Sequence, residues 1–241
     1  MKLILVSVFL GLFSLMYAQS IIGDIESFNG NVKIKPDNSI KKTKVYLGLK
    51  IYEGDMIISS KNSSVAIRLV DGSTLVLDEL STLHFSSLYG AEQEKGKILY
   101  KITSRNAKNS LKITTPFAVI GIKGTTFIVN ATKTSSVLLK EGLIGIQSIH
   151  KEFELYRKNE QKKFDDFREK QEAAKEIEMN AFEKFKNTQY QVQKPIKTKE
   201  FHLESGHSVS FNGSKVQEST FEDSDDASFE YFDKLIKSMK R

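Results

Sequence analysis

Three residues near the C-terminal end carry side chains that commonly bind metal ions: His202, Glu204 and His207. Side chains alternate between the two faces of an extended strand, so His202 and Glu204 share a face, and a turn at Ser205-Gly206 would bring His207 opposite Glu204. Such a set suits zinc. An exposed polar hairpin explains it more simply, because no fourth ligand and no group that would orient the imidazoles can be named. No cofactor is therefore predicted.

The stretch from Gly121 to Thr126, GIKGTT, has the composition of a phosphate-binding loop. Such a loop needs a glycine directly before the lysine, a hydroxyl residue directly after it and a helix to follow. Here Lys123 follows an isoleucine and precedes Gly124, and the next residues are typical of a strand. The chain also has no cysteine and no G-x-S-x-G turn to expose a nucleophilic serine. These classes of chemistry are not predicted.

Four acidic residues could supply a general acid and a general base: Asp55, Asp71, Asp78 and Glu79. Two carboxylates across one cleft form the arrangement that hydrolyses glycosidic bonds. Asp55 and Asp71, however, stand beside glycines in turn-like sequences, where acidic residues are common for backbone reasons. A carboxylate-based glycosidase remains a remote alternative, and the chain is predicted not to be an enzyme.

Residues 1–18 have the layout of a secretory signal peptide, with an apolar run from Leu3 to Met16 followed by Ala18. The run is shorter than the roughly 18 to 20 residues that a membrane-spanning helix needs. We expect cleavage near Gln19, with retention as an anchor as the alternative. The predicted location is the periplasm or the cell surface of a bacterium, and the absence of cysteine means that burial and hydrogen bonds alone must stabilise the fold.

The net charge of +6 arises from lysines and arginines interleaved with acidic residues. A mixed-charge soluble surface is the simpler interpretation, since salt screens dispersed exposed charges. The alternative is attraction to anionic partners such as phospholipid head groups or acidic polysaccharide. Nucleic acid is not an expected partner outside the cytoplasm.

Residues 21–149 alternate apolar and polar side chains in short runs separated by glycine turns, which predicts strands. Asp71-Gly72 lies between two such runs and predicts a hairpin. Asn29-Gly30 and Glu141-Gly142 are expected to play the same part. The predicted fold is all-β, a sandwich or roll of stacked hairpins.

Residues 150–194 contain no glycine and no proline and are rich in charged residues, which predicts a long helix inserted into the β fold. Apolar residues at three- and four-residue steps would form one stripe along it. We expect this arm to dock on the β domain, to form a helical hairpin, or to pair with another helix as a coiled coil. The candidate partner-binding residues of the arm are Phe153, Tyr156, Phe164, Phe167, Ile177 and Phe185.

Beyond Pro195 the strand pattern resumes, and residues 195–221 are predicted to close the β domain with a hairpin. Residues 222–241 combine an acidic stretch with an amphipathic segment, which predicts a short terminal helix. Its apolar side is expected to hold Phe229, Phe232, Leu235, Ile236 and Met239.

Four sequence segments, taken in order, resemble the FecR domain, the family named after a periplasmic regulator of ferric citrate uptake. They are YEGDMIISSKNSSVAIRLVDGSTLVLDELSTLHF, KGKILYKI, LKITTPFAVIGIKGTTFIV and VLLKEGLIGI. The resemblance covers about residues 23–149 and 201–211. Its signature residues are Gly54, Asp55, Asp71, Gly72, Ser73, Gly96, Thr115, Pro116, Gly121, Gly124, Thr125, Phe127 and Gly142.

Backbone geometry accounts for these residues without a ligand. Glycine reaches positive φ without steric cost, as turns require at Gly72, Gly124 and Gly142. Pro116 lacks an amide hydrogen and belongs at a strand start or edge. We therefore expect structural rather than ligand-binding roles for the whole signature.

The resemblance implies a β-rich interaction module outside the cytoplasm. It does not carry over an anti-sigma role, because no helical region that would hold a sigma factor precedes the domain. We expect a non-catalytic interaction or sensing module that binds an envelope protein or self-associates through the arm. Binding of envelope polysaccharide or peptidoglycan is the alternative.

Overall fold

The structure is a computed structural model that describes residues 19–103, 111–122, 124–157 and 195–239. This part of the chain is built mostly of strands, with one helix, α3 (Asp223–Ser238), at its C-terminal end. The strands are β1 (Ile21–Asn29), β2 (Val32–Lys35), β3 (Thr43–Lys44), β4 (Lys50–Tyr52), β5 (Met56–Ser59), β6 (Ser64–Leu69), β7 (Thr74–Leu77), β8 (Thr82–Ser87), β9 (Gly90–Lys101), β10 (Leu111–Thr114), β11 (Val119–Ile122), β12 (Thr126–Ala131), β13 (Ser135–Glu141), β14 (Leu143–Gln147), β15 (Phe153–Arg157), β16 (Ile196–Thr198), β17 (Glu200–Glu204), β18 (His207–Asn212) and β19 (Lys215–Thr220).

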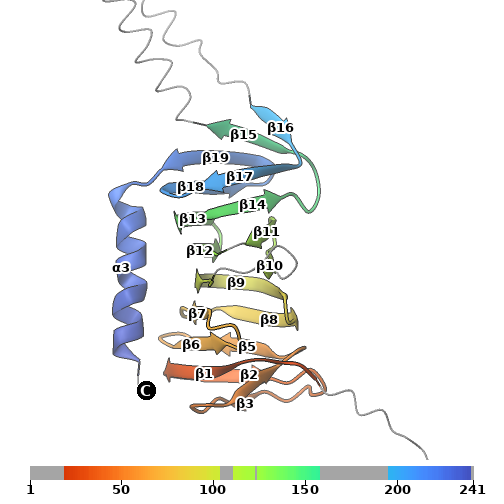
Figure 1. The fold of residues 1–241 in the computed structure, drawn as a ribbon, viewed down its shortest axis with the longest axis vertical. Helices are drawn as coiled ribbons and strands as arrows, with labels where there is room; N and C mark the ends of the chain where they lie inside the picture. The colour runs from red at the N-terminus through yellow and green to blue at the C-terminus, as the bar shows by residue number, and fades with distance from the viewer. Residues whose placement is uncertain (1–18, 104–110, 123, 158–194, 240–241) are drawn as a thin grey trace, which may run out of the picture.

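The strands stack into a tall column of two facing layers (Figure 1). One layer, sheet A, has the order β4-β1-β6-β7-β9-β12-β13-β18-β19-β15-β16. The other, sheet B, has the order β3-β2-β5-β8-β9-β10-β11-β14-β17. Strand β9 belongs to both, and it bends from sheet B into sheet A at Gly96.

The core lies between the two sheets because alternate residues of each strand point inward. At its centre the rings of Tyr100 and Phe127 stack with centroids 4.8 Å apart. The Tyr100 hydroxyl donates to Gln93, 2.9 Å away, and the Gln93 amide donates to the carbonyl of Val129 at 3.1 Å. The buried polar groups at this point therefore have partners, as a stable core requires.

The four turns singled out in the sequence are of two kinds: one joins two paired strands of the same sheet, and three connect the two sheets. Asp71-Gly72 joins β6 to β7, which pair directly, so the predicted hairpin is confirmed. The hairpins predicted at Asn29-Gly30, Glu141-Gly142 and Ser205-Gly206 are wrong, since each of these turns connects a strand of one sheet to a strand of the other. Both flanking strands then bury their apolar faces in the shared core and pair with other strands.

The helix predicted over residues 150–194 is wrong where the structure describes it. Residues 153–157 form strand β15, which pairs with β19 in parallel and with β16 antiparallel. Phe153 and Leu155 alternate with polar residues and are buried, a period of two that sheet pairing stabilises more than helix propensity would. Phe164, Phe167, Ile177 and Phe185 lie outside the described residues. Because Leu155 pairs with Ile196, residues 158–194 are inserted between two adjacent strands.

Helix α3 begins with a capping box, in which the Glu222 amide donates to the Asp225 carboxylate at 3.1 Å. The first turn contains Asp223, Asp225 and Asp226, whose negative charges interact favourably with the positive end of the helix dipole. The predicted terminal helix is confirmed, and its apolar side holds the residues expected. Among the described residues, no helix is long and apolar enough to cross a membrane.

Candidate interaction surfaces

Gly54 and Asp55 form a tight turn ahead of β5. The Asp55 side chain is only 4% exposed, and its carboxylate accepts hydrogen bonds from the amides of Tyr52 (2.9 Å) and Asp37 (3.3 Å). A Cβ on Gly54 would lie 2.4 Å from the Cβ of Asp37, so only glycine fits. Both residues therefore serve the backbone.

Asp71 and Ser73 fix the β6–β7 hairpin and tie it to the end of β9. The Asp71 carboxylate accepts from the Ser73 amide at 3.1 Å and from its hydroxyl at 2.8 Å. The Ser73 hydroxyl in turn accepts from the amide of Thr103 at 3.1 Å. Gly72 has a φ of 83°, the positive value that the sequence predicted for this turn.

The remaining signature residues also contact the domain itself. The Thr115 hydroxyl bridges the turn to Ala118, accepting from its amide at 2.9 Å. Gly142 lies so close to the next turn that a Cβ would approach Thr125 Cγ2 at 2.6 Å. Gly124 and Gly142 have φ values of 65° and 95°, the positive values expected of them. Gly121 differs, since it is exposed and a Cβ there would meet only the carbonyl oxygen of Gly145, at 4.0 Å.

Residues 55–145 match the FecR family. The family is described as FecR protein, and the match spans the signature from Asp55 to Gly142, so the predicted resemblance is confirmed over this range. No match was found among curated proteins.

Two crystal structures of a candidate anti-sigma factor from Parabacteroides distasonis ATCC 8503, at 1.65 and 2.50 Å resolution, resemble the chain with 10% identity and a TM-score of 0.45. Each alignment covers 68% of this chain and 59% of the other, so the chain spans less than two thirds of that protein. A cell surface anchoring domain aligns with 27% of this chain and 86% of its own length, with 27% identity and a TM-score of 0.26. The likeness to the FecR family rests on the sequence match over residues 55–145.

Helix α3 covers a straight row of apolar residues on the outer face of sheet A, within the FecR region. Each successive strand contributes one residue, and neighbours in the row are direct cross-strand partners. The row consists of Ala66, Val76, Leu99, Ile128 and Leu138. Phe229 and Phe232 of the helix pack against it, as does Met239, which directly follows the helix.

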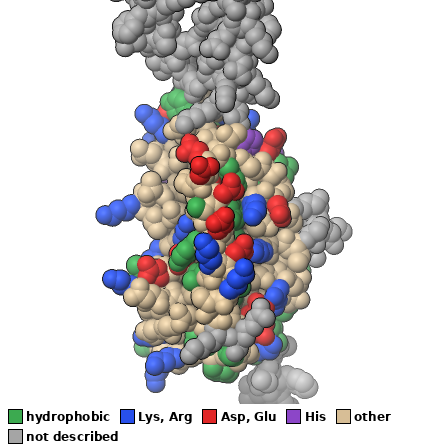
Figure 2. All heavy atoms as spheres, turned by 90° about the vertical axis from the view of Figure 1, so that its left-hand side faces the viewer, with side chains coloured by type: hydrophobic (Ala, Val, Ile, Leu, Met, Phe, Trp, Pro, Cys, Tyr) green, Lys and Arg blue, Asp and Glu red, His purple; other side chains and the backbone are tan. Residues whose placement is uncertain are grey.

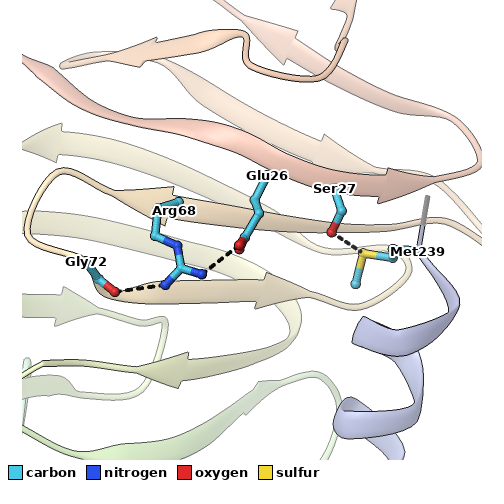
Figure 3. A network of polar contacts seen from close by, with 5 residues as sticks. All are labelled: Glu26, Ser27, Arg68, Gly72 and Met239. Atoms are coloured by element: carbon cyan, nitrogen blue, oxygen red, sulfur yellow. Dashed lines mark hydrogen bonds and ion pairs between the residues drawn. The ribbon is translucent and has the colours of Figure 1, made fainter. Parts of the chain in front are cut away.

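The helix spans the row almost from end to end. Ser27 on β1 extends the row at one end and Ser208 on β18 at the other. Strands β1, β6, β7, β9, β12, β13 and β18, spaced about 4.8 Å apart, cover about 29 Å, while the 16 residues of α3 cover about 24 Å. Ser208 donates to Asp225 at 3.3 Å, and Ser27 donates to the sulfur of Met239 at 3.6 Å (Figure 3). The helix thus bridges strands that are far apart in the sheet.

Polar contacts along both sides hold α3 in place. Lys101 and Asp233 form an ion pair at 3.0 Å, and the Tyr231 hydroxyl donates to Asp78 at 2.8 Å. The pKa of Tyr231 is raised to about 12, mainly by burial and to a smaller extent by the hydrogen bond to Asp78. Burial beneath the helix lowers the pKa of Lys97, whose ammonium lies 5.8 Å from the centre of the Phe232 ring. Helix α3 therefore occupies this face of sheet A, and acidic and basic side chains lie on the outer surface of this side of the molecule (Figure 2).

Arg68 links the hairpin turn to the neighbouring strand beside this face. Its guanidinium donates to Glu26 on β1 at 2.6 Å and to the carbonyl of Gly72 at 3.1 Å (Figure 3). The turn of the β6–β7 hairpin is thereby tied to β1.

The metal-ligand candidates do not converge as the sequence suggested. His202 and Glu204 lie on β17 in sheet B, whereas His207 lies on β18 in sheet A. His202 pairs with Gly145, and His207 pairs with Leu139. Among the described residues, no group of three or more ligand-type side chains could hold a metal ion.

The four carboxylates weighed for catalysis have separate local partners. Asp55 and Asp71 accept the backbone hydrogen bonds given above. Asp78 accepts from Tyr231, and Glu79 accepts from the amide of Asn62 at 2.6 Å. Each carboxylate thus fixes a turn or the terminal helix.

Asp55 should give stability an unusual pH dependence. Burial raises the pKa of its carboxyl, against the two backbone amides that lower it. Its contribution is therefore present below its unfolded pKa and is lost as pH rises through its folded pKa. In urea unfolding between pH 3.5 and 7, the free energy of unfolding of the wild type minus that of Asp55→Asn should fall as pH rises. A difference that stays flat or rises would contradict the assignment.

Proposed function

We propose that this chain is a non-catalytic interaction module of the bacterial cell envelope, exported from the cytoplasm, which binds a protein partner through the segment between β15 and β16. The FecR match supports an extracytoplasmic setting. The signature side chains described above bond within the fold, which supports a structural role for them rather than a catalytic one.

The observation that carries the proposal is the pairing of Leu155 with Ile196. Strands β15 and β16, which flank residues 158–194 in the sequence, are adjacent and lie at the end of sheet A (Figure 1). The column supplies a rigid base there, since Phe153 packs against Phe201 and Phe211 with ring centroids 5.6 and 5.9 Å away. The sequence of the segment, with Phe164, Phe167 and Ile177 on one predicted stripe, suits the groove of a protein partner or a second copy.

Replacing residues 158–194 with a turn of about four residues tests the proposal, because such a turn can join two paired antiparallel strands. The variant keeps β15 and β16. We expect crosslinking in intact cells, followed by affinity recovery, to yield one defined envelope protein, or a second copy, with the full chain and to lose it with the variant. A matched control, Phe164→Leu with Phe167→Leu, keeps the apolar stripe and should retain the partner.

Unchanged recovery from a correctly folded shortened variant would overturn the proposal. If the full chain recovers no protein but is retained on purified peptidoglycan or polysaccharide, a glycan-binding role would replace the proposal. Circular dichroism and a thermal melt of the variant establish that the column is intact.

A further inference from the structure

The end of the column opposite the β15–β16 insertion exposes an unusual mixture of apolar and basic side chains. Residues 40–47, IKKTKVYL, run through β3 at this end (Figure 1). Ile40 is 98% exposed, Tyr46 62% and Leu47 45%. Lys41, Lys42 and Lys44 lie between them and are also exposed. These six residues are called the basal patch below.

The basal patch is held outward by ordered structure. Thr43 and Lys44 pair with Ile34 and Lys33 of β2. Val45 is buried, and its amide donates to the carbonyl of Val32 at 3.2 Å. The next turn is closed by the Leu49 amide, which donates to the Tyr46 carbonyl at 3.2 Å. The apolar side chains therefore face solvent because the backbone is fixed on both sides of them.

Within the described residues, no acidic side chain forms an ion pair with Lys41, Lys42 or Lys44. Lys44 lies directly opposite Lys33 across the β2–β3 ladder, a like-charge pair that weakens a sheet. The acidic first turn of α3 lies toward the other end of the column.

We propose that the basal patch binds the surface of a membrane containing anionic phospholipids. Clustered lysines are attracted to anionic head groups. Isolated, highly exposed isoleucine, leucine and tyrosine side chains enter the boundary between head groups and acyl chains. Acidic polysaccharide would use the lysines but would leave Ile40 and Leu47 in water, so a lipid surface accounts for more of the patch. The end of the column that carries β15 and β16 then faces away from the membrane.

Vesicle binding tests the proposal directly, using the protein recovered after export. We expect binding to vesicles of phosphatidylglycerol and phosphatidylcholine, with little binding to phosphatidylcholine alone. Changing Lys41, Lys42 and Lys44 to glutamine should weaken binding on the order of 100-fold. Changing Lys197, Lys199 and Lys215, three exposed lysines at the opposite end, removes the same charge and should leave binding nearly unchanged.

An optical reporter locates the contact. The chain contains no tryptophan, so Tyr46→Trp places a single indole in the basal patch. Its emission should shift to the blue with phosphatidylglycerol vesicles and stay unchanged with phosphatidylcholine. Absence of the shift, equal binding of the two lysine variants, or retention on acidic polysaccharide without vesicle binding would each overturn the proposal. None of these results depends on the protein partner at the other end.

Discussion

Phe232→Ala is expected to lower the free energy of unfolding by about 3–5 kcal/mol. Phe232 is 0% exposed and lies between α3 and the apolar row of sheet A. Truncation removes a large buried ring and leaves a cavity that a helix held at both ends cannot readily close. Chemical denaturation measures the loss, and binding of a hydrophobic dye should rise because Leu99 and Ile128 become accessible.

Glu230→Ala is the matched control on the same helix. Glu230 is largely exposed and contacts Lys234 at 3.9 Å, so its loss should change stability by less than about 0.5 kcal/mol. If Phe232→Ala and Glu230→Ala had equal effects, α3 would not be packed on sheet A as described.

Gly96→Ala is expected to destabilise the protein by about 2–5 kcal/mol, from backbone strain together with overpacking. Gly96 has a φ of 93°, and an added Cβ would lie 2.1 Å from the Ser81 hydroxyl and 2.4 Å from the Ser81 Cα. The position matters because β9 passes from sheet B to sheet A there. Thermal and urea unfolding both report the change.

Gly213→Ala separates the two causes. Gly213 also has a positive φ, 62°, but a Cβ there meets nothing within 4 Å. We expect only the cost of the left-handed backbone, about 1–2 kcal/mol. A loss at Gly96 no larger than that at Gly213 would show that the contact with Ser81 is unimportant.

The sequence determined the local conformation of this protein well. Asp71-Gly72 forms the predicted hairpin, and the glycines expected at positive φ have it. These outcomes depend on a few neighbouring residues and on backbone sterics. The FecR resemblance and the apolar side of α3 were likewise readable, since both depend on spacing along the chain.

Tertiary structure decided which strands become neighbours. A glycine turn reverses the chain equally well within one sheet or between two, so Asn29-Gly30, Glu141-Gly142 and Ser205-Gly206 could not be told from a hairpin. This choice separated His202 from His207. Residues 153–157 became a strand because β16 and β19 offered it partners.

The sequence also contains a signal for the docking of α3, although the alternating pattern of most strands makes it hard to notice. Runs such as ILY at 98–100 and FIV at 127–129 are apolar at every position, which indicates strands buried on both faces. Something had to cover the outer face of those strands, and the only described helix does so. The sequence thus determined that a cover was needed, while the register that lines up Ala66, Val76 and Leu99 decided where α3 lies.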